Sequence, residues 1–140
     1  MKNYTSYDLI EWGKPFEIRQ NAMPEPTLSE VLVRVTAAGL CHSDLHVQKG
    51  YMDLGEEGRL TFAERGAQLP MTFGHEIAGI VEAIGDDVKT VSKGQQVLVF
   101  PWIGCGDCLA CHEDRESDCS AMRIIGLKQK GGFATHCLVE

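Results

Sequence analysis

The stretch GCGDCLACHEDRESDCS, residues 104–120, decides the fold of this chain. Its cysteines follow the spacing Cys105-x2-Cys108-x2-Cys111-x7-Cys119. Zinc takes four thiolates in a tetrahedron, and closely spaced cysteines let one tight loop supply three of them. The surrounding segment holds few large apolar residues, so it has little to fold around without a metal. We therefore predict a closed structural zinc site in a lobe spanning about residues 101–123.

Two other interpretations of these cysteines remain open. Disulfides fit poorly, because three cysteines at such short spacing cannot pair without strain. Four thiolates also suit iron, and the ligand set alone does not separate the two metals. An electron-transfer iron protein would be coloured, whereas a zinc protein would not. His112 lies inside the lobe, and we expect it to be a solvated residue because four cysteines already complete the zinc shell.

The bulk composition limits the class of protein further. The chain has 140 residues, enough for one domain with a real core. Its formal net charge is -7 and its basic residues are not clustered, which argues against nucleic acid as a partner. No apolar stretch is long enough to span a bilayer, and the N-terminus does not resemble a secretory signal. We expect a cytoplasmic location, where cysteines serve metals or catalysis more often than disulfides.

The rest of the chain favours short strands separated by glycine and proline. Alternating apolar residues and turn signals predict strands over 4–12, 16–22, 31–36 ended by Gly39, 71–84 with breaks at Gly74 and Gly79, 96–100 and 133–139. A short helix is expected over 41–49, stopped by Gly50. Residues 50–70 read as an irregular surface excursion with one short helix around 61–65. This pattern predicts a mainly β fold with short helices, arranged as a partly open β-barrel.

A second group of candidate ligands lies upstream of the cysteine lobe. The sequence GLCHSDLH occupies residues 39–46, and Gly74-His75-Glu76 follows later. Taken singly, Cys41 reads as a buried apolar cysteine and His75 as a satisfied core histidine. Together with Glu76 they offer a thiolate, an imidazole and a carboxylate. Catalytic zinc takes three protein ligands and keeps a fourth position open, so the group predicts such a site.

These motifs resemble the zinc-containing medium-chain alcohol dehydrogenase family, in its N-terminal GroES-like catalytic domain. The family signature Gly-His-Glu-x2-Gly-x5-Gly-x2-Val is present from Gly74 to Val88, and the segment 39–44 and the four-cysteine lobe match as well. The resemblance covers nearly the whole chain. One departure is Gln95, where the family usually has an aspartate after the glycine; we expect it to affect a turn and leave the chemistry unchanged.

The resemblance implies a role for each matching residue. Cys41 and His75 would bind the catalytic zinc, and Glu76 would lie beside the metal and bind it at times. Asp44 would accept from the ring of His75 and fix its tautomer. Ser43 would hydrogen-bond the alcohol oxygen, His46 would pass the proton toward solvent by way of the cofactor ribose, and His42 would lie near the cofactor pyrophosphate.

Simpler roles are open for some of these residues. Ser43 and Asp44 are good residues for a helix start, and His46 fits equally well as a solvated helix residue. In the last predicted strand, Cys137 is expected to pack inward and His136 to face outward.

The resemblance also implies partners that these residues do not supply. No Gly-x-Gly-x2-Gly fingerprint follows a strand, so we expect residues 1–140 to be the GroES-like domain without a Rossmann cofactor domain. The expected function is oxidation of primary or secondary alcohols to aldehydes or ketones with NAD or NADP, in a homo-oligomer once a cofactor domain is joined. The chain alone is expected to be inactive, with the third protein ligand of the catalytic zinc coming from elsewhere. The alternative is a non-catalytic zinc-binding module of the same fold.

Overall fold

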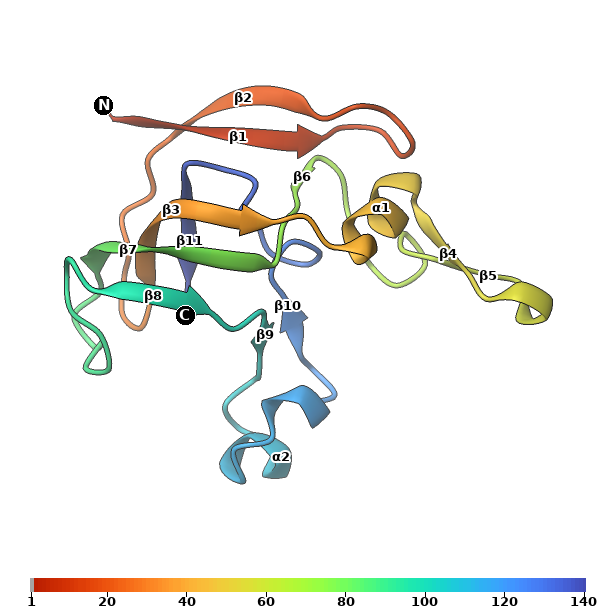
Figure 1. Cartoon of the computed structure of the whole chain (residues 1–140). Helices are drawn as coiled ribbons and strands as arrows, with labels where there is room; N and C mark the ends of the chain where they lie inside the picture. Colours follow the sequence, from red (N-terminus) through yellow and green to blue (C-terminus); the bar gives the residue numbers. More distant parts are fainter. Residues whose placement is uncertain (1) are drawn as a thin grey trace.

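The computed structural model describes residues 2–140, which form mostly strands with a few short helices (Figure 1). In chain order the elements are β1 (Asn3–Leu9), β2 (Glu17–Ala22), β3 (Val31–Gly39), α1 (His42–Lys49), β4 (Tyr51–Asp53), η1 (Gly55–Glu57), β5 (Arg59–Thr61), β6 (Met71–Thr72), β7 (Glu76–Ile84), β8 (Gln96–Val99), β9 (Trp102–Ile103), α2 (Leu109–His112), η2 (Glu116–Asp118), β10 (Arg123–Ile124) and β11 (His136–Val139). The predicted fold class is confirmed, and the barrel is not closed.

The larger sheet has the strand order β11-β3-β7-β8, and all of its neighbours run antiparallel. Alternate residues of β3 and β7 point to the same side, as the period of two in a strand requires. The inward side chains form one core cluster with the end of the chain: Val31, Val33, Ile77, Val81, Ile125, Cys137 and Val139. This core holds β3 and β7 rigidly side by side, and both strands lead into the candidate site.

The smaller sheet has the order β2-β1-β6 and lies above the first (Figure 1). The segment before β11 joins the two sheets, since the Tyr7 N–H donates to the Phe133 carbonyl at 2.8 Å and the Val35 N–H donates to the Thr135 carbonyl at 2.9 Å. Between this sheet and α1 a second core cluster forms from Leu9, Val47, Phe62, Ala67 and Phe73. It fixes helix α1 against the barrel.

Most of the predicted elements are present with shifted bounds. The helix expected over 41–49 is α1, and Gly50 ends it with a left-handed φ of 89°, which glycine adopts without strain. The first strand ends at Leu9 and does not reach residue 12, and the last begins at His136 where 133 was expected. The predicted break at Gly74 is confirmed, because this residue has a φ of 90° between β6 and β7.

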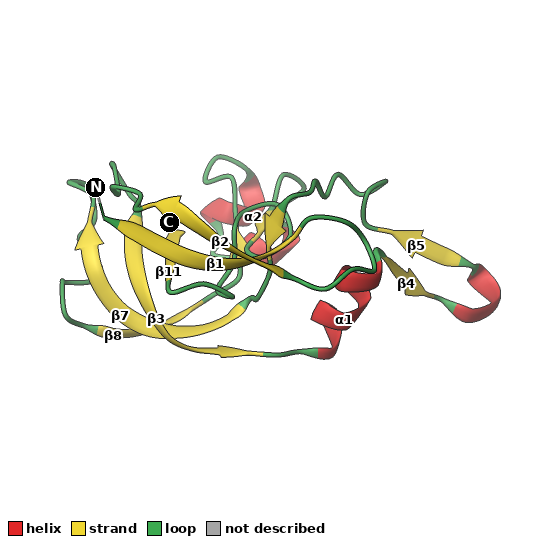
Figure 2. Cartoon of the chain, turned by 90° about the horizontal axis from the view of Figure 1, so that it is seen from above, coloured by secondary structure: helices red, strands yellow, loops and turns green. Residues whose placement is uncertain are grey.

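Two local predictions are wrong. Residues 61–65 form no helix: β4 and β5 pair as a hairpin that extends beyond α1, and the chain then turns (Figure 2). Gly79 does not interrupt its strand but lies within β7, opposite Val35 at a register shift of β3. A Cβ at Gly79 would overlap Val33, so glycine serves the close approach of the two strands there.

The last strand gives one confirmed expectation and one correction. Cys137 packs inward as predicted and is 3% exposed. His136 does not face freely outward, because its side chain is only 12% exposed and its Nε2 lies 3.1 Å from the Glu82 carboxylate on β7. Arg34, which lies opposite His136 in the pairing of β11 with β3, also lies 3.8 Å from the Glu82 carboxylate. Among residues 2–140, no helix is long and apolar enough to cross a membrane.

Candidate metal centres

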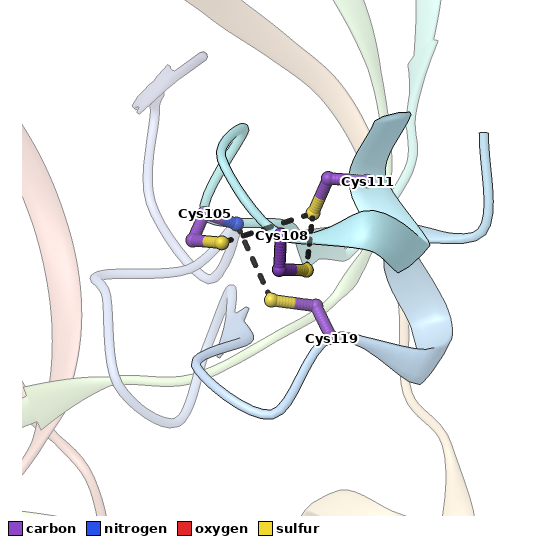
Figure 3. Close-up of side chains that lie close together, drawn as sticks. All are labelled: Cys105, Cys108, Cys111 and Cys119. Carbon is purple, nitrogen blue, oxygen red and sulfur yellow. Dashed lines mark hydrogen bonds between the residues drawn. The ribbon is translucent and has the colours of Figure 1, made fainter. Parts of the chain in front are cut away.

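The four lobe cysteines converge on one point, and their sulfur atoms face each other (Figure 3). Their ligand atoms all lie within 4.8 Å of one another, and the Sγ atoms of Cys108 and Cys111 are 3.5 Å apart. Sulfur atoms bound to one zinc at about 2.3 Å are ~3.8 Å apart in a tetrahedron. A disulfide needs a separation of about 2 Å, and all six cysteines are free. The donor set and its spacing therefore fit zinc.

The backbone of the lobe is shaped around these sulfur atoms. The antiparallel pair β9 and β10 forms its base, and the short helices α2 and η2 carry Cys111 and lead to Cys119. A Cβ added at Gly104 would lie 2.6 Å from Cys111 Sγ and 2.8 Å from Glu116 Cγ. Glycine at this position lets the chain pass close to the sulfur. Cys119 is the one buried residue of 101–123, so apolar packing contributes little to the lobe.

Backbone amides make the lobe ready for thiolates. Hydrogen bonds from the Asp107 and Cys108 amides, helped by neighbouring thiols, lower the pKa of Cys105 to about 6. The Gly106 amide also lowers the pKa of Cys111, but desolvation and the neighbouring sulfur atoms outweigh it and raise that pKa to about 11. One thiolate therefore forms readily, and its negative charge disfavours deprotonation of a second thiol. A bound dication removes this opposition, since coordinated thiols are deprotonated.

The second cluster begins where β3 ends and α1 starts. Cys41 is the N-cap of α1, with extended backbone angles of φ -93° and ψ 158°. Asp44, the third helical residue, reaches back so that its Oδ2 accepts from the Cys41 N–H at 2.9 Å. This capping interaction holds the thiol of Cys41 at the entrance of the helix. Ser43 and Asp44 therefore do not cap the helix themselves, and Asp44 stabilises the cap from inside.

His75 enters the cluster from the short link between β6 and β7. Its neighbour Gly74 has no room for a side chain, because a Cβ there would lie 2.6 Å from the Phe133 ring. The Gly74 carbonyl also accepts from the Gly132 N–H at 2.8 Å, which fixes the link. His75 Nδ1 lies 3.5 Å from Oδ1 of Asp44, a carboxylate that is only 3% exposed. A proton on Nδ1 would face this carboxylate and leave Nε2 as the ligand atom.

Cys41, His75 and Glu76 bring one ligand atom each to within 4.8 Å of the others. A thiolate, an imidazole and a carboxylate are all ordinary zinc ligands, and three of them leave a fourth position free. Cys41 and His75 are half-buried and Glu76 is exposed, so the cluster opens toward solvent on the Glu76 side. The cluster fits zinc in an open site, in contrast to the closed set of four cysteines.

The predicted proton-relay and cofactor residues lie on α1 beside this cluster. Ser43 is exposed, and its Oγ accepts from the Cys41 thiol at 3.5 Å. His46 follows one helical turn later and is half-buried, while His42 is exposed. The rings of the two histidines contact each other, with centroids 4.7 Å apart. His112, on α2 in the other lobe, is exposed and lies outside the sets of potential ligands.

The sequence marks Gly104 and Gly106 as positions that leave the backbone free to wrap the metal, and the close approach of Gly104 to Cys111 Sγ agrees with this. Sequence reasoning missed the role of Gly39 at the open cluster. Gly39 lies directly opposite Glu76 in the pairing of β3 with β7, and a Cβ at Gly39 would overlap the Glu76 carboxylate. The role of Gly39 has no signal in the spacing of the ligands. Gly39 could have been found only from the register of two strands that lie far apart in the sequence.

Comparison with known proteins identifies the family. Residues 27–140 match the model of the alcohol dehydrogenase GroES-like domain. An NAD-dependent alcohol dehydrogenase of Sulfurisphaera tokodaii is 42% identical over 132 residues, which are 94% of this chain and 37% of that protein. The chain thus spans about 37% of the length of this relative.

Solved structures agree with the sequence comparison. The D-arabinose dehydrogenase from Sulfolobus solfataricus superposes with a TM-score of 0.79 at 31% identity, over 99% of this chain and 38% of that one. A cobalt- and zinc-bound thermostable alcohol dehydrogenase from Pyrobaculum aerophilum gives a TM-score of 0.80 at 26% identity, over 99% and 39% of the two chains. The similarity to these dehydrogenases covers both candidate metal centres.

Proposed function

This chain belongs to the family of alcohol dehydrogenase GroES-like domains, and from this membership we propose that it acts as the zinc-holding catalytic domain of an alcohol dehydrogenase. The reaction is oxidation of a primary or secondary alcohol to an aldehyde or ketone with NAD or NADP, once a cofactor domain is joined. The observation that carries this proposal is the Cys41–His75–Glu76 cluster, with three converging ligand atoms and one open side. A purely structural module has no need of such an opening.

The residues around the opening supply the acid–base part of the reaction. When bound, zinc supplies a Lewis acid that lowers the pKa of an alcohol toward neutrality. Ser43, whose Oγ lies 3.5 Å from Cys41 Sγ, is placed to accept a hydrogen bond from the alcohol hydroxyl. His46 is three residues further along α1 and so shares the face of Ser43. We assign it the transfer of the proton from Ser43 toward solvent.

The remaining roles support this geometry. Asp44 holds both the Cys41 amide and the His75 ring, so it fixes the two strongest ligands relative to each other. His42, exposed at the first turn of α1, is assigned to the cofactor pyrophosphate. The nicotinamide itself must be held by a Rossmann domain, since no dinucleotide fingerprint occurs in the sequence. The four-cysteine centre has no open position and is assigned a structural role.

Cobalt substitution tests the proposal without needing turnover. Cobalt bound by thiolate and imidazole absorbs visible light, and its spectrum changes when an outside ligand enters the open position. We expect imidazole to shift the bands of the chain loaded at both centres, and Cys41→Ser to abolish this shift. A spectrum that never responds to imidazole would favour the non-catalytic zinc module. Steady reduction of added NAD by the chain alone would contradict the assigned need for a cofactor domain.

A further inference from the structure

The strand pairing places a glycine directly opposite the only carboxylate among the three open-site ligand residues. Gly39 is the last residue of β3 and pairs with Glu76, the first residue of β7. Opposed side chains in an antiparallel pair normally stand about 5 Å apart on one face of the sheet. Because Gly39 has no side chain, the Glu76 side chain folds over its Cα. Two residues after Gly39 lies Cys41, so this fold directs the Glu76 carboxylate toward the thiol.

The three atoms nearest to a Cβ built at Gly39 all belong to Glu76. A Cβ built at Gly39 would overlap Glu76 Oε2 and would lie 3.0 Å from Glu76 Cβ and 3.2 Å from Glu76 Cδ. All three contacts are with Glu76: Oε2 and Cδ belong to the flexible end of its side chain, whereas Cβ is fixed by the β7 backbone. Gly39 lies in a strand and has no left-handed φ, so its backbone conformation does not itself require glycine. The absence of a side chain at Gly39 serves the carboxylate.

We propose that Gly39 is a positioning residue that admits the Glu76 carboxylate to the Cys41–His75–Glu76 metal centre. The proposal rests on the proposed function of that centre. An alanine at position 39 would displace the far end of Glu76, which can turn away at low cost, while the 3.0 Å contact with Glu76 Cβ requires the two strands to give by a few tenths of an ångström. The turned carboxylate would leave Cys41 and His75 as the only two ligand residues at the centre. Gly39 therefore sets the number of protein ligands.

The test is a cobalt-binding titration of the chain with four variants: Gly39→Ala, Glu76→Ala, the double variant, and Thr36→Ala as a control on the same strand. Thr36 donates to the Ala78 carbonyl at 3.2 Å and is exposed, away from the ligand atoms. Visible spectra follow the open site, and competition with a chromophoric chelator gives the affinity of each centre. Circular dichroism and the affinity of the four-cysteine centre report on folding.

Gly39→Ala should weaken cobalt binding at the open site by about 10-fold to 100-fold, the usual effect of losing a partner that orients a ligand. Glu76→Ala should cause a similar loss, and the double variant should be no weaker than Glu76→Ala, since both changes remove the same carboxylate. The four-cysteine centre and the Thr36→Ala variant should be unchanged.

Three results would overturn the proposal. If Glu76→Ala weakens binding but Gly39→Ala does not, Gly39 has no positioning role and the assigned ligand set stands. If Gly39→Ala weakens binding equally with and without Glu76, the glycine acts through the strand and not through the carboxylate. If Glu76→Ala leaves the affinity unchanged, Glu76 is no ligand, and its place in the proposed function fails as well.

Discussion

Asp44 is the residue whose change should reveal most about the open metal centre. Its carboxylate is 3% exposed, accepts from the Cys41 N–H at 2.9 Å through Oδ2, and faces His75 Nδ1 at 3.5 Å through Oδ1. Asp44→Asn keeps the shape of the side chain but turns one of these acceptors into a donor. If the amide oxygen stays with Cys41, its NH2 group faces His75 Nδ1 and forces the ring proton onto Nε2. If the amide turns round, two donors meet at the Cys41 N–H.

Either orientation of the amide should lower the stability of the fold or the affinity for metal. A hydrogen bond to a charged group contributes about 1.5–3 kcal/mol, so Asp44→Asn should lower the free energy of unfolding by about 2 kcal/mol. For a chain of this length that corresponds to a fall in Tm of roughly 6 °C. A proton on Nε2 blocks the ligand atom of His75, so affinity for metal at the open site should fall about 10-fold to 100-fold. The four-cysteine centre lies on another lobe and should keep its affinity.

Urea unfolding of the zinc-loaded chain measures the stability, and cobalt titration measures the affinity of the open site. Asp53→Asn is the matched control, because Asp53 also accepts one backbone N–H, from Gly55 at 2.9 Å, but on the exposed hairpin. The control should change stability by less than about 0.5 kcal/mol. If Asp44→Asn resembles Asp53→Asn in both measurements, Asp44 does not organise the centre and the reasoning fails.

Three further predictions concern the lobe and the core. Gly104→Ala, which would place a Cβ 2.6 Å from Cys111 Sγ, should weaken zinc binding in the lobe by about 1–3 kcal/mol, measured by chelator competition; an unchanged affinity would show that the lobe adapts freely. Removing zinc should raise the rate of amide hydrogen exchange over residues 101–123, because the lobe has almost no apolar core, and should leave β3 and β7 protected. Full protection of the lobe amides without metal would refute this. Burial raises the pKa of Cys137 to about 12, so the folded state favours the neutral thiol and the free energy of unfolding falls as the pH rises from about 9 toward 12. At pH 8 iodoacetamide should label this cysteine only in denaturant. Rapid labelling of the folded chain would contradict its burial.

The sequence predicts most strands because their signals are local. Alternation of apolar residues marks β3. Gly50, which ends α1, and Gly74, which breaks the chain before β7, both have a positive φ that glycine alone adopts easily.

The helix expected over 61–65 fails because tertiary contacts decide this segment. Residues 59–61 become a strand by pairing with β4, and residues 62–66 form turns in which the Phe62 carbonyl accepts from the Arg65 and Ala67 N–H groups while Phe62 packs into the second core cluster. Strand pairing depends on two segments together, so it cannot be predicted from the sequence of either segment alone.

Some candidate ligands are also grouped by local sequence, and others are brought together by the fold. Spacing alone groups Cys105, Cys108, Cys111 and Cys119, because a tight loop with such spacing has few other uses. Cys41 and His75 lie 34 positions apart in the sequence. Their residue types together with Glu76 suggest an open zinc site, and the resemblance to a known family strengthens that prediction before the fold is seen. Gly39 lies in the segment that matches the family, but its role escapes both kinds of reasoning, since that role depends on the residue that β7 places opposite it.

The central claim is that this chain builds two unlike metal centres, and zinc content tests it most directly. The measurement is zinc bound per chain, at increasing strength of a competing chelator, for the wild type, Cys41→Ser and Cys119→Ser. We predict one tightly held and one weakly held zinc in the wild type. Cys41→Ser should lose only the weak one, and Cys119→Ser only the tight one. A wild type that binds a single zinc, or a Cys41→Ser variant that still binds two, would contradict the account.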